Sequence, residues 1–305
     1  MNSTATREKL EGERLQIAEE MMLLRYWQHL VNEDLKQKKF LIPIHLAFGY
    51  EAIAVAVSRM MTGDDQLILS HRNIAYNLAR AKSLKPVLDE YQLLPTGAGR
   101  GKLGSMNLAN PGVGVMYASS ILGNNLSMAC GLAMGKQVLQ KPGLVTVLTG
   151  DGAMEEGPFY EGLVFSKSQR LPLLFIVENN NQSMSSTIEQ RRCPISLEKM
   201  CSAVGIPFQP LSGNDVFHHL SSLKAIREQV LQQQGPMCLE VFLTAFNQHA
   251  GPTPGWPTDP KNISIQNGLM LEQGPNDPLF VLEQKMDPRQ FAELSGRILD
   301  GKGGE

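Results

Sequence analysis

The sequence predicts an α/β fold of three layers, with helices on both sides of a mostly parallel central sheet. Two short apolar runs, 144–148 and 173–177, are separated by about the length of one helix. This spacing is typical of a β-α-β unit, in which a helix joins two neighbouring parallel strands. A third buried run, 238–246, follows a helical segment at 215–233. Alternation of strands and helices of this kind favours a parallel sheet.

The N-terminal half is predicted to be mainly helical up to the first apolar run. A short strand or turn is expected at 66–70. The segment 96–117 is rich in glycine and lacks periodicity, so we predict a loop there. Structureless loops of this length are uncommon unless they bind something. Helices are expected in this half over residues 11–38, 52–59, 73–83 and 122–139.

The C-terminal half continues the alternation and ends in a flexible segment. A crossover helix is predicted over 158–168, because proline is tolerated close to a helix start. Further helices are expected over 196–204 and 215–233, the second capped by Asn214 or Asp215. A second long loop is expected over 247–265. We expect one domain over residues 1–290, followed by a C-terminal helix end and flexible tail over 291–305.

Composition excludes several classes of function. A formal net charge of −2 over 305 residues provides no electrostatic footprint for nucleic acid. No stretch is long and apolar enough to cross a membrane, and the N-terminus lacks the hydrophobic region of a signal peptide. We therefore expect a cytoplasmic protein. Its four cysteines lack paired spacing and are expected to be reduced thiols: Cys130, Cys193, Cys201 and Cys238.

Polar side chains follow both strands of the predicted β-α-β unit. Asp151 lies in a Gly-Asp-Gly motif directly behind the first apolar run, and Asn180 lies 29 residues later, behind the second. Both positions fall at the carboxyl ends of neighbouring parallel strands, where open α/β sheets bind ligands. A carboxylate and a carboxamide, beside a glycine that permits close backbone approach, suit a divalent cation that holds a diphosphate.

This motif resembles the magnesium and thiamine diphosphate (ThDP) signature of the α chains of 2-oxoacid dehydrogenase E1 components. The blocks at 49–52 and 100–106 are also similar to that family, and the resemblance covers roughly residues 15–255. It implies a ThDP-binding fold that holds the diphosphate half of the cofactor. Segments 120–127 and 155–157 look more like the corresponding half of transketolases.

The resemblance implies a set of site residues. Magnesium would be bound by Asp151, Asn180 and the backbone carbonyl of Gln182. Arg72 would contact the diphosphate, although it could also belong to a surface basic pair. Glu161 would contribute to cofactor binding, or could be a solvated helix residue. The remaining implied cofactor-binding residues are Gly150, Gly152 and Ala153.

Several active-site positions depart from the family pattern. His249 matches the family's second active-site histidine if one residue is deleted, and is the predicted catalytic residue. Ile74 and Asn107 stand where the family commonly has histidine, and Ala245 where it has an arginine. His29, His45, His218 and His219 are interpreted as ordinary helix or surface histidines, with His45 the least certain because it adjoins the 49–52 block.

The resemblance implies the α subunit of a two-chain ThDP enzyme, working as α2β2. It would act on a 2-oxoacid or related ketone donor, with decarboxylation followed by acyl transfer to the lipoyl groups of an acyltransferase. A glutamate that activates the cofactor pyrimidine would come from the β chain, and Glu51 should not be given that role. The alternatives are a transketolase-like or acyloin-forming C–C transferase and a non-catalytic regulatory subunit. Retention of both Asp151 and Asn180 disfavours the last of these.

Overall fold

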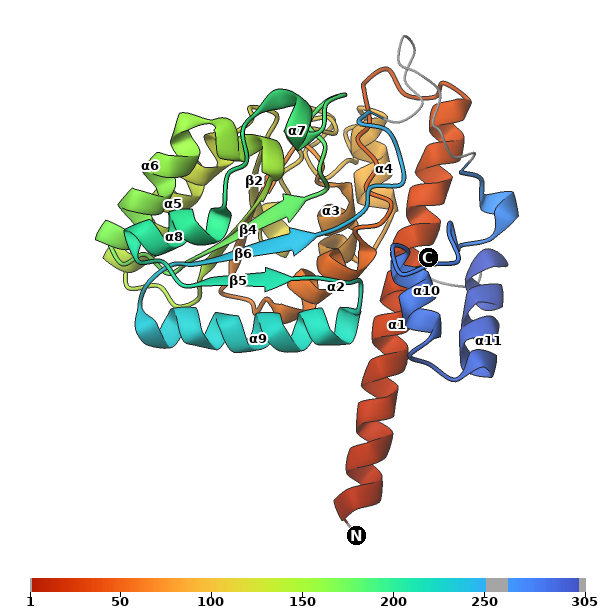
Figure 1. Cartoon of the computed structure of the whole chain (residues 1–305). Helices are drawn as coiled ribbons and strands as arrows, with labels where there is room; N and C mark the ends of the chain where they lie inside the picture. Colours follow the sequence, from red (N-terminus) through yellow and green to blue (C-terminus); the bar gives the residue numbers. More distant parts are fainter. Residues whose placement is uncertain (1, 251–262, 302–305) are drawn as a thin grey trace.

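A computed structural model of the chain describes residues 2–250 and 263–301 (Figure 1). Its strands are β1 (Gln66–Ser70), β2 (Val115–Ser119), β3 (Val145–Gly150), β4 (Leu173–Asn179), β5 (Phe208–Leu211) and β6 (Met237–Phe242). Its α-helices are α1 (Asn2–Lys36), α2 (Glu51–Met60), α3 (Ile74–Ala81), α4 (Lys85–Tyr91), α5 (Asn124–Val138), α6 (Gly157–Ser168), α7 (Ile188–Arg191), α8 (Leu197–Val204), α9 (Val216–Gln233), α10 (Pro278–Glu283) and α11 (Pro288–Leu299). Short 3₁₀ turns are η1 (Pro111–Val113), η2 (Asp151–Glu155) and η3 (Ile265–Asn267).

The strands form one sheet in the order β2-β1-β3-β4-β6-β5, and every adjacent pair is parallel. The predicted parallel sheet is confirmed. The chain places β2 on one side of β1 and then β3 on the other side of β1. The direction in which strands are added to the sheet therefore reverses beside β1. Such switch points leave a crevice at the carboxyl ends of the strands, where α/β proteins bind ligands.

Helices cover both faces of the sheet and confirm the three-layer prediction. Side chains of β4 alternate between two buried cores: Leu174 and Ile176 join the core under α2 and α9, whereas Phe175 and Val177 join the core under α5, α6 and α8. A strand buried on both faces is therefore apolar at successive positions. Figure 1 shows α9 on one side of the sheet and α5, α6 and α8 on the other.

The N-terminal helix α1 and the C-terminal helices α10 and α11 pack together beside the sheet domain (Figure 1). The boundary expected at residue 290 falls inside α11, which runs as one helix from Pro288 to Leu299. The buried faces of α1 and α11 contribute Met21, Leu24 and Ile298 to the larger core. The C-terminal segment therefore packs against α1 almost to the last described residue.

A buried ion triad joins these terminal helices to the sheet domain. The Arg25 guanidinium on α1 contacts the Glu51 carboxylate at 2.7 Å and the Asp277 carboxylate at 3.0 Å, and all three side chains are fully buried. It also donates to the Leu269 carbonyl oxygen at 2.9 Å. Burial alone would raise the pKa of Asp277, but the charge of Arg25 holds that pKa below its usual value. Glu51 thus has a structural partner in Arg25.

Replacing Arg25 with methionine should destabilise the fold by about 3–5 kcal/mol, because two buried carboxylates would lose their counter-charge. Urea unfolding followed by circular dichroism measures the change. Arg297→Met is the matched control: this α11 arginine pairs with Glu19 of α1 at 2.7 Å, but its side chain is 51% exposed. Exposed pairs contribute about 0–1 kcal/mol. Equal effects of the two substitutions would show that the buried triad contributes nothing special.

The sequence prediction missed two short edge strands and the helices α4 and α10. β2 begins at the end of the segment expected to be a loop over 96–117 and continues to Ser119, and β5 was not expected. β5 contains Pro210, which is tolerated because an edge strand has a free side. Asp215, one of the two predicted caps, accepts hydrogen bonds from the backbone of Phe217 and His218 at the start of α9.

The remaining part of the 96–117 segment is a loop organised by one carboxylate. Glu90 accepts hydrogen bonds from the backbone N–H groups of Gly99, Gly101, Leu103 and Gly104 at 2.7–3.1 Å. The second predicted loop lies largely outside the described residues, as do residues 302–305 of the predicted tail. Within the described residues, no helix combines the length and apolar character needed to span a membrane. All four cysteines are free, as expected.

Candidate active site

A cavity of about 350 Å³ lies at the carboxyl ends of β1, β2, β3 and β4, beside the point where the strand order reverses. The predicted residues that line it are Arg72, Gly150, Asp151, Gly152, Ala153, Asn180, Gln182 and His249. The fold therefore brings together residues up to 177 positions apart, as the Arg72–His249 contact shows. Glu161 is not among the lining residues. It lies on an exposed part of α6, in agreement with the alternative of a solvated helix residue.

The three predicted metal ligands share this cavity. Asp151 is 1% exposed and begins η2 directly after β3. The Asn180 amide donates to the Tyr50 hydroxyl at 2.6 Å, and its oxygen accepts from the Gln182 backbone N–H at 2.9 Å. These contacts hold the Asn180 side chain in one orientation. A carboxylate, a carboxamide and a backbone carbonyl are oxygen donors of the kind that hard divalent cations prefer.

Gly152 explains why the motif needs glycine after the aspartate. A Cβ atom at this position would lie 2.5 Å from the Ser183 hydroxyl oxygen and 2.9 Å from its Cβ atom. The segment after β4 therefore approaches the turn after β3 more closely than any larger residue would allow. This approach places Gln182 and Ser183 against the wall formed by η2.

An arginine that the sequence analysis missed pairs with the predicted metal ligand. The Arg191 guanidinium contacts the Asp151 carboxylate at 2.6 Å and the Glu155 carboxylate at 2.6 Å. Arg192 contacts the same Glu155 at 3.0 Å. Burial raises the pKa of Asp151, and the contact with Arg191 opposes that rise. No local pattern identifies this pair, since Arg191 is 40 residues from Asp151.

Arg72 is buried in the wall of the cavity, as expected for an anion-binding group. Its guanidinium donates to the backbone carbonyl oxygens of Leu46 and His249, the second at 3.0 Å. Neighbouring residues after β1 are fixed by Asn73, which donates to the carbonyl oxygens of Ser105 and Met106. The 96–117 segment thereby contributes Met106 to the cavity, which agrees with the binding role proposed for it.

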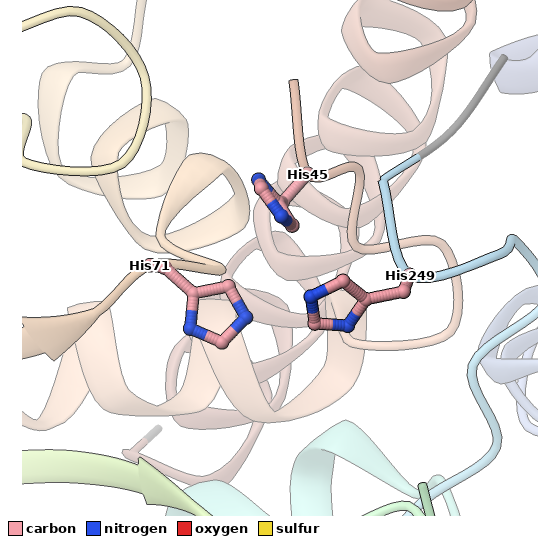
Figure 2. Close-up of side chains that lie close together, drawn as sticks. All are labelled: His45, His71 and His249. Atoms are coloured by element: carbon pink, nitrogen blue, oxygen red, sulfur yellow. The ribbon is translucent and has the colours of Figure 1, made fainter. Parts of the chain in front are cut away.

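His249 does not stand alone in the cavity. The imidazole rings of His45, His71 and His249 point toward one another, with ring centroids 4.9, 5.0 and 5.2 Å apart (Figure 2). Burial, followed by nearby positive charge, lowers the pKa of His71 to about 3 and that of His249 to about 4. Both imidazoles are therefore neutral near pH 7. His45 also lines the cavity, which corrects the prediction that it is an ordinary helix or surface histidine.

Glu178 is a further cavity residue that the sequence analysis left unassigned. It is 3% exposed and accepts a hydrogen bond from the Tyr76 hydroxyl at 2.5 Å. Burial raises the pKa of Glu178 to about 7. The three departures from the family pattern lie outside the residues that line the cavity. Ile74 is buried at the start of α3, Asn107 accepts from the Ser120 backbone at 3.3 Å, and Ala245 packs against the main core.

Fold and cavity together define an α/β protein with a ligand site at the carboxyl edge of a parallel sheet, where an arginine and several oxygen donors face one space. The chain belongs to the dehydrogenase E1 component family, which matches residues 19–256. Members of this family use thiamine diphosphate. The predicted family and the predicted cofactor-binding fold are thus confirmed.

Curated relatives include α subunits of two kinds of enzyme. The chain is 30% identical over 272 residues to the mitochondrial pyruvate dehydrogenase E1 α subunit of Saccharomyces cerevisiae, covering 89% of this chain and 63% of that one. It is 27% identical over 230 residues to the acetoin:2,6-dichlorophenolindophenol oxidoreductase α subunit of Bacillus subtilis, covering 75% and 69%. The mitochondrial pyruvate dehydrogenase E1 α subunit of Schizosaccharomyces pombe is 28% identical over 248 residues, and this chain spans 60% of its length.

Among solved structures, transketolase from Campylobacter jejuni is similar in fold. The TM-score is 0.58 at 17% identity, with 94% of this chain and 48% of the transketolase chain covered. At this level of identity the likeness concerns the fold alone.

Proposed function

We propose that this chain is the α subunit of a two-chain ThDP-dependent enzyme that decarboxylates a 2-oxoacid and transfers the acyl group. The observation that carries the proposal is the convergence of Asp151, Asn180, Gln182 and Arg72 on one cavity. The first three provide oxygen donors for a magnesium ion, and the guanidinium provides a diphosphate contact. Family membership supplies the cofactor class.

The residues present fit magnesium and the diphosphate. Asn180 is held in place by Tyr50, and the space beside Gly152 is too small for any side chain. Arg191 occupies one oxygen of the Asp151 carboxylate. A magnesium ion would therefore bind the other oxygen or displace the guanidinium. In either case the buried carboxylate has a positive partner both before and after cofactor binding.

Bound ThDP would supply a thiazolium carbon that adds to a carbonyl and a ring that accepts the electron pair after C–C cleavage. The chain's own residues do the rest. Arg72 and the metal ligands would hold the diphosphate. His249 is neutral near pH 7, because its pKa is lowered to about 4. We assign to this neutral imidazole the role of proton acceptor in the reaction.

We further propose that a β chain covers an apolar face next to the cavity and that the assembly is α2β2. Exposed apolar side chains gather on the contacting helices α5 and α6: Met128, Met134, Val138, Tyr160, Val164 and Phe165. Ile121 and Leu122, which line the cavity, are also exposed. Large exposed apolar patches mark interaction sites. The two relatives are named as α subunits, which supports the proposal that a chain of another type is the partner.

The isolated chain should show no turnover with any 2-oxoacid, and its co-encoded β chain should restore activity. This follows because the pyrimidine-activating glutamate is proposed to come from that partner. Purified chains are assayed alone and mixed, with a lipoyl acceptor. Val164→Lys, on the apolar face at 52% exposure, should weaken assembly, whereas Leu41→Lys, at 92% exposure near the end of α1, is the control. Robust turnover by the chain alone would refute the two-chain arrangement.

A second candidate is an acyloin-forming or transketolase-like C–C transferase that uses the same cofactor and an aldehyde acceptor. It is favoured by the acetoin-linked relative and by the absence of family histidines at Ile74 and Asn107. Replacing the lipoyl acceptor with an aldehyde in the same assay separates the two reactions. Product formed only with the aldehyde would favour this candidate over acyl transfer to a lipoyl acyltransferase.

A further inference from the structure

We propose that His45, His71 and His249 form a binding site for a divalent transition-metal ion, separate from the magnesium ligands in the same cavity. The three imidazoles come from the segment before α2, the end of β1 and the segment after β6. One nitrogen from each lies within 4.8 Å of the others. Figure 2 shows the rings facing a common space. The ligand set is therefore assembled by the fold from three distant parts of the chain.

The protonation state of the cluster suits metal binding. A metal requires the neutral imidazole, the form that burial favours, and His45 is buried while His71 and His249 are partly buried. His45 is 7% exposed, and its Nδ1 atom is buried without a hydrogen-bond partner. A buried polar atom without a partner is costly. A bound metal ion would provide the missing partner.

The donor atoms select the class of ion. Imidazole nitrogens suit zinc, cobalt and copper, whereas magnesium prefers oxygen ligands. Three histidines with one open position are a recurring arrangement for zinc. Zinc–nitrogen distances of about 2.0–2.1 Å place tetrahedral ligand atoms about 3.4 Å apart. The three nitrogens, which lie within 4.8 Å of one another, would have to approach to that separation on metal binding. The fourth position would face the cavity.

Arg72 limits the affinity of this site. Its guanidinium lies against the backbone of His249 and repels a cation. An anionic fourth ligand would offset that repulsion, so we expect metal binding to strengthen when a small carboxylate is present. Metal binding would also occupy the His249 imidazole. If the proposed function holds, a zinc-class ion would then inhibit turnover, because His249 could no longer accept a proton.

Cobalt titration of the metal-stripped full chain tests the site directly. Tetrahedral nitrogen-ligated Co²⁺ absorbs visible light, so we expect a spectrum that saturates at one equivalent. His45→Ala and His71→Ala should each weaken binding by on the order of tenfold or more. Asp151→Ala should retain the spectrum, because it removes only the proposed magnesium ligand. His218→Ala, at an exposed position on α9, is the matched control and should also retain it.

Absence of a saturable cobalt spectrum in the wild-type chain would overturn the proposal. So would equal binding by wild type and both histidine variants, provided that circular dichroism shows the variants folded. Two variants are used because His45 is buried, whereas His71 is only partly so. Zinc inhibition is then measured on the assembled enzyme. For each variant it is the ratio of the turnover with zinc to the turnover without zinc. The cobalt result does not depend on activity, so a failure of the proposed reaction would leave it interpretable.

Discussion

Asp151→Ala should abolish magnesium-dependent ThDP binding while leaving the chain folded. The carboxylate is the only acidic member of the proposed magnesium ligands, and removing it leaves a neutral amide and a backbone carbonyl. The residue lies in the turn after β3, where its side chain contributes little to core packing. Its partner Arg191 retains the contact with Glu155 at 2.6 Å, so the guanidinium is not left unpaired.

Calorimetry on the assembled complex, with and without magnesium, measures this effect. Asp64→Ala is the control, because Asp64 is an exposed aspartate in the turn before β1 and away from the cavity. Thermal unfolding of each variant monitors the fold. Undiminished ThDP affinity in Asp151→Ala would remove Asp151 from the metal site. The sequence motif would then be only a turn.

His249→Ala should lower turnover by roughly a hundredfold or more, the usual scale for loss of a general acid–base group. ThDP affinity should change little. The reason lies in the geometry of Arg72, which donates a hydrogen bond to the backbone carbonyl oxygen of His249. Alanine preserves that backbone contact, so the proposed diphosphate clamp remains while the proton acceptor is lost.

Turnover of His249→Ala is compared with wild type in two assays, 2-oxoacid with a lipoyl acceptor and 2-oxoacid with an aldehyde. His218→Ala controls for the loss of a histidine elsewhere on the chain. A wild-type rate in both assays would exclude His249 from the mechanism. A loss of ThDP affinity equal to the loss of turnover would instead identify a binding role for its side chain.

Much of the fold was predictable because its signals are local. The strands β3 and β4 are continuous apolar runs, and the polar motifs directly behind them mark their carboxyl ends. The edge strands β2 and β5 were missed for a physical reason. Each has a single neighbour, and each is only four or five residues long. A short strand with one free side needs neither a long apolar run nor exclusion of proline.

By itself, the sequence determined the fold class, the family resemblance and the placement of Asp151 and Asn180 at one site, because these depend on short motifs at a defined spacing. Tertiary structure alone decided which other groups meet those residues. Arg25 meets an aspartate 252 positions away, and His249 meets Arg72 across 177 positions. Ion pairs and imidazole contacts act over a few ångströms of space and carry no periodicity along the chain. Their partners therefore become known only when the sheet brings the segments together.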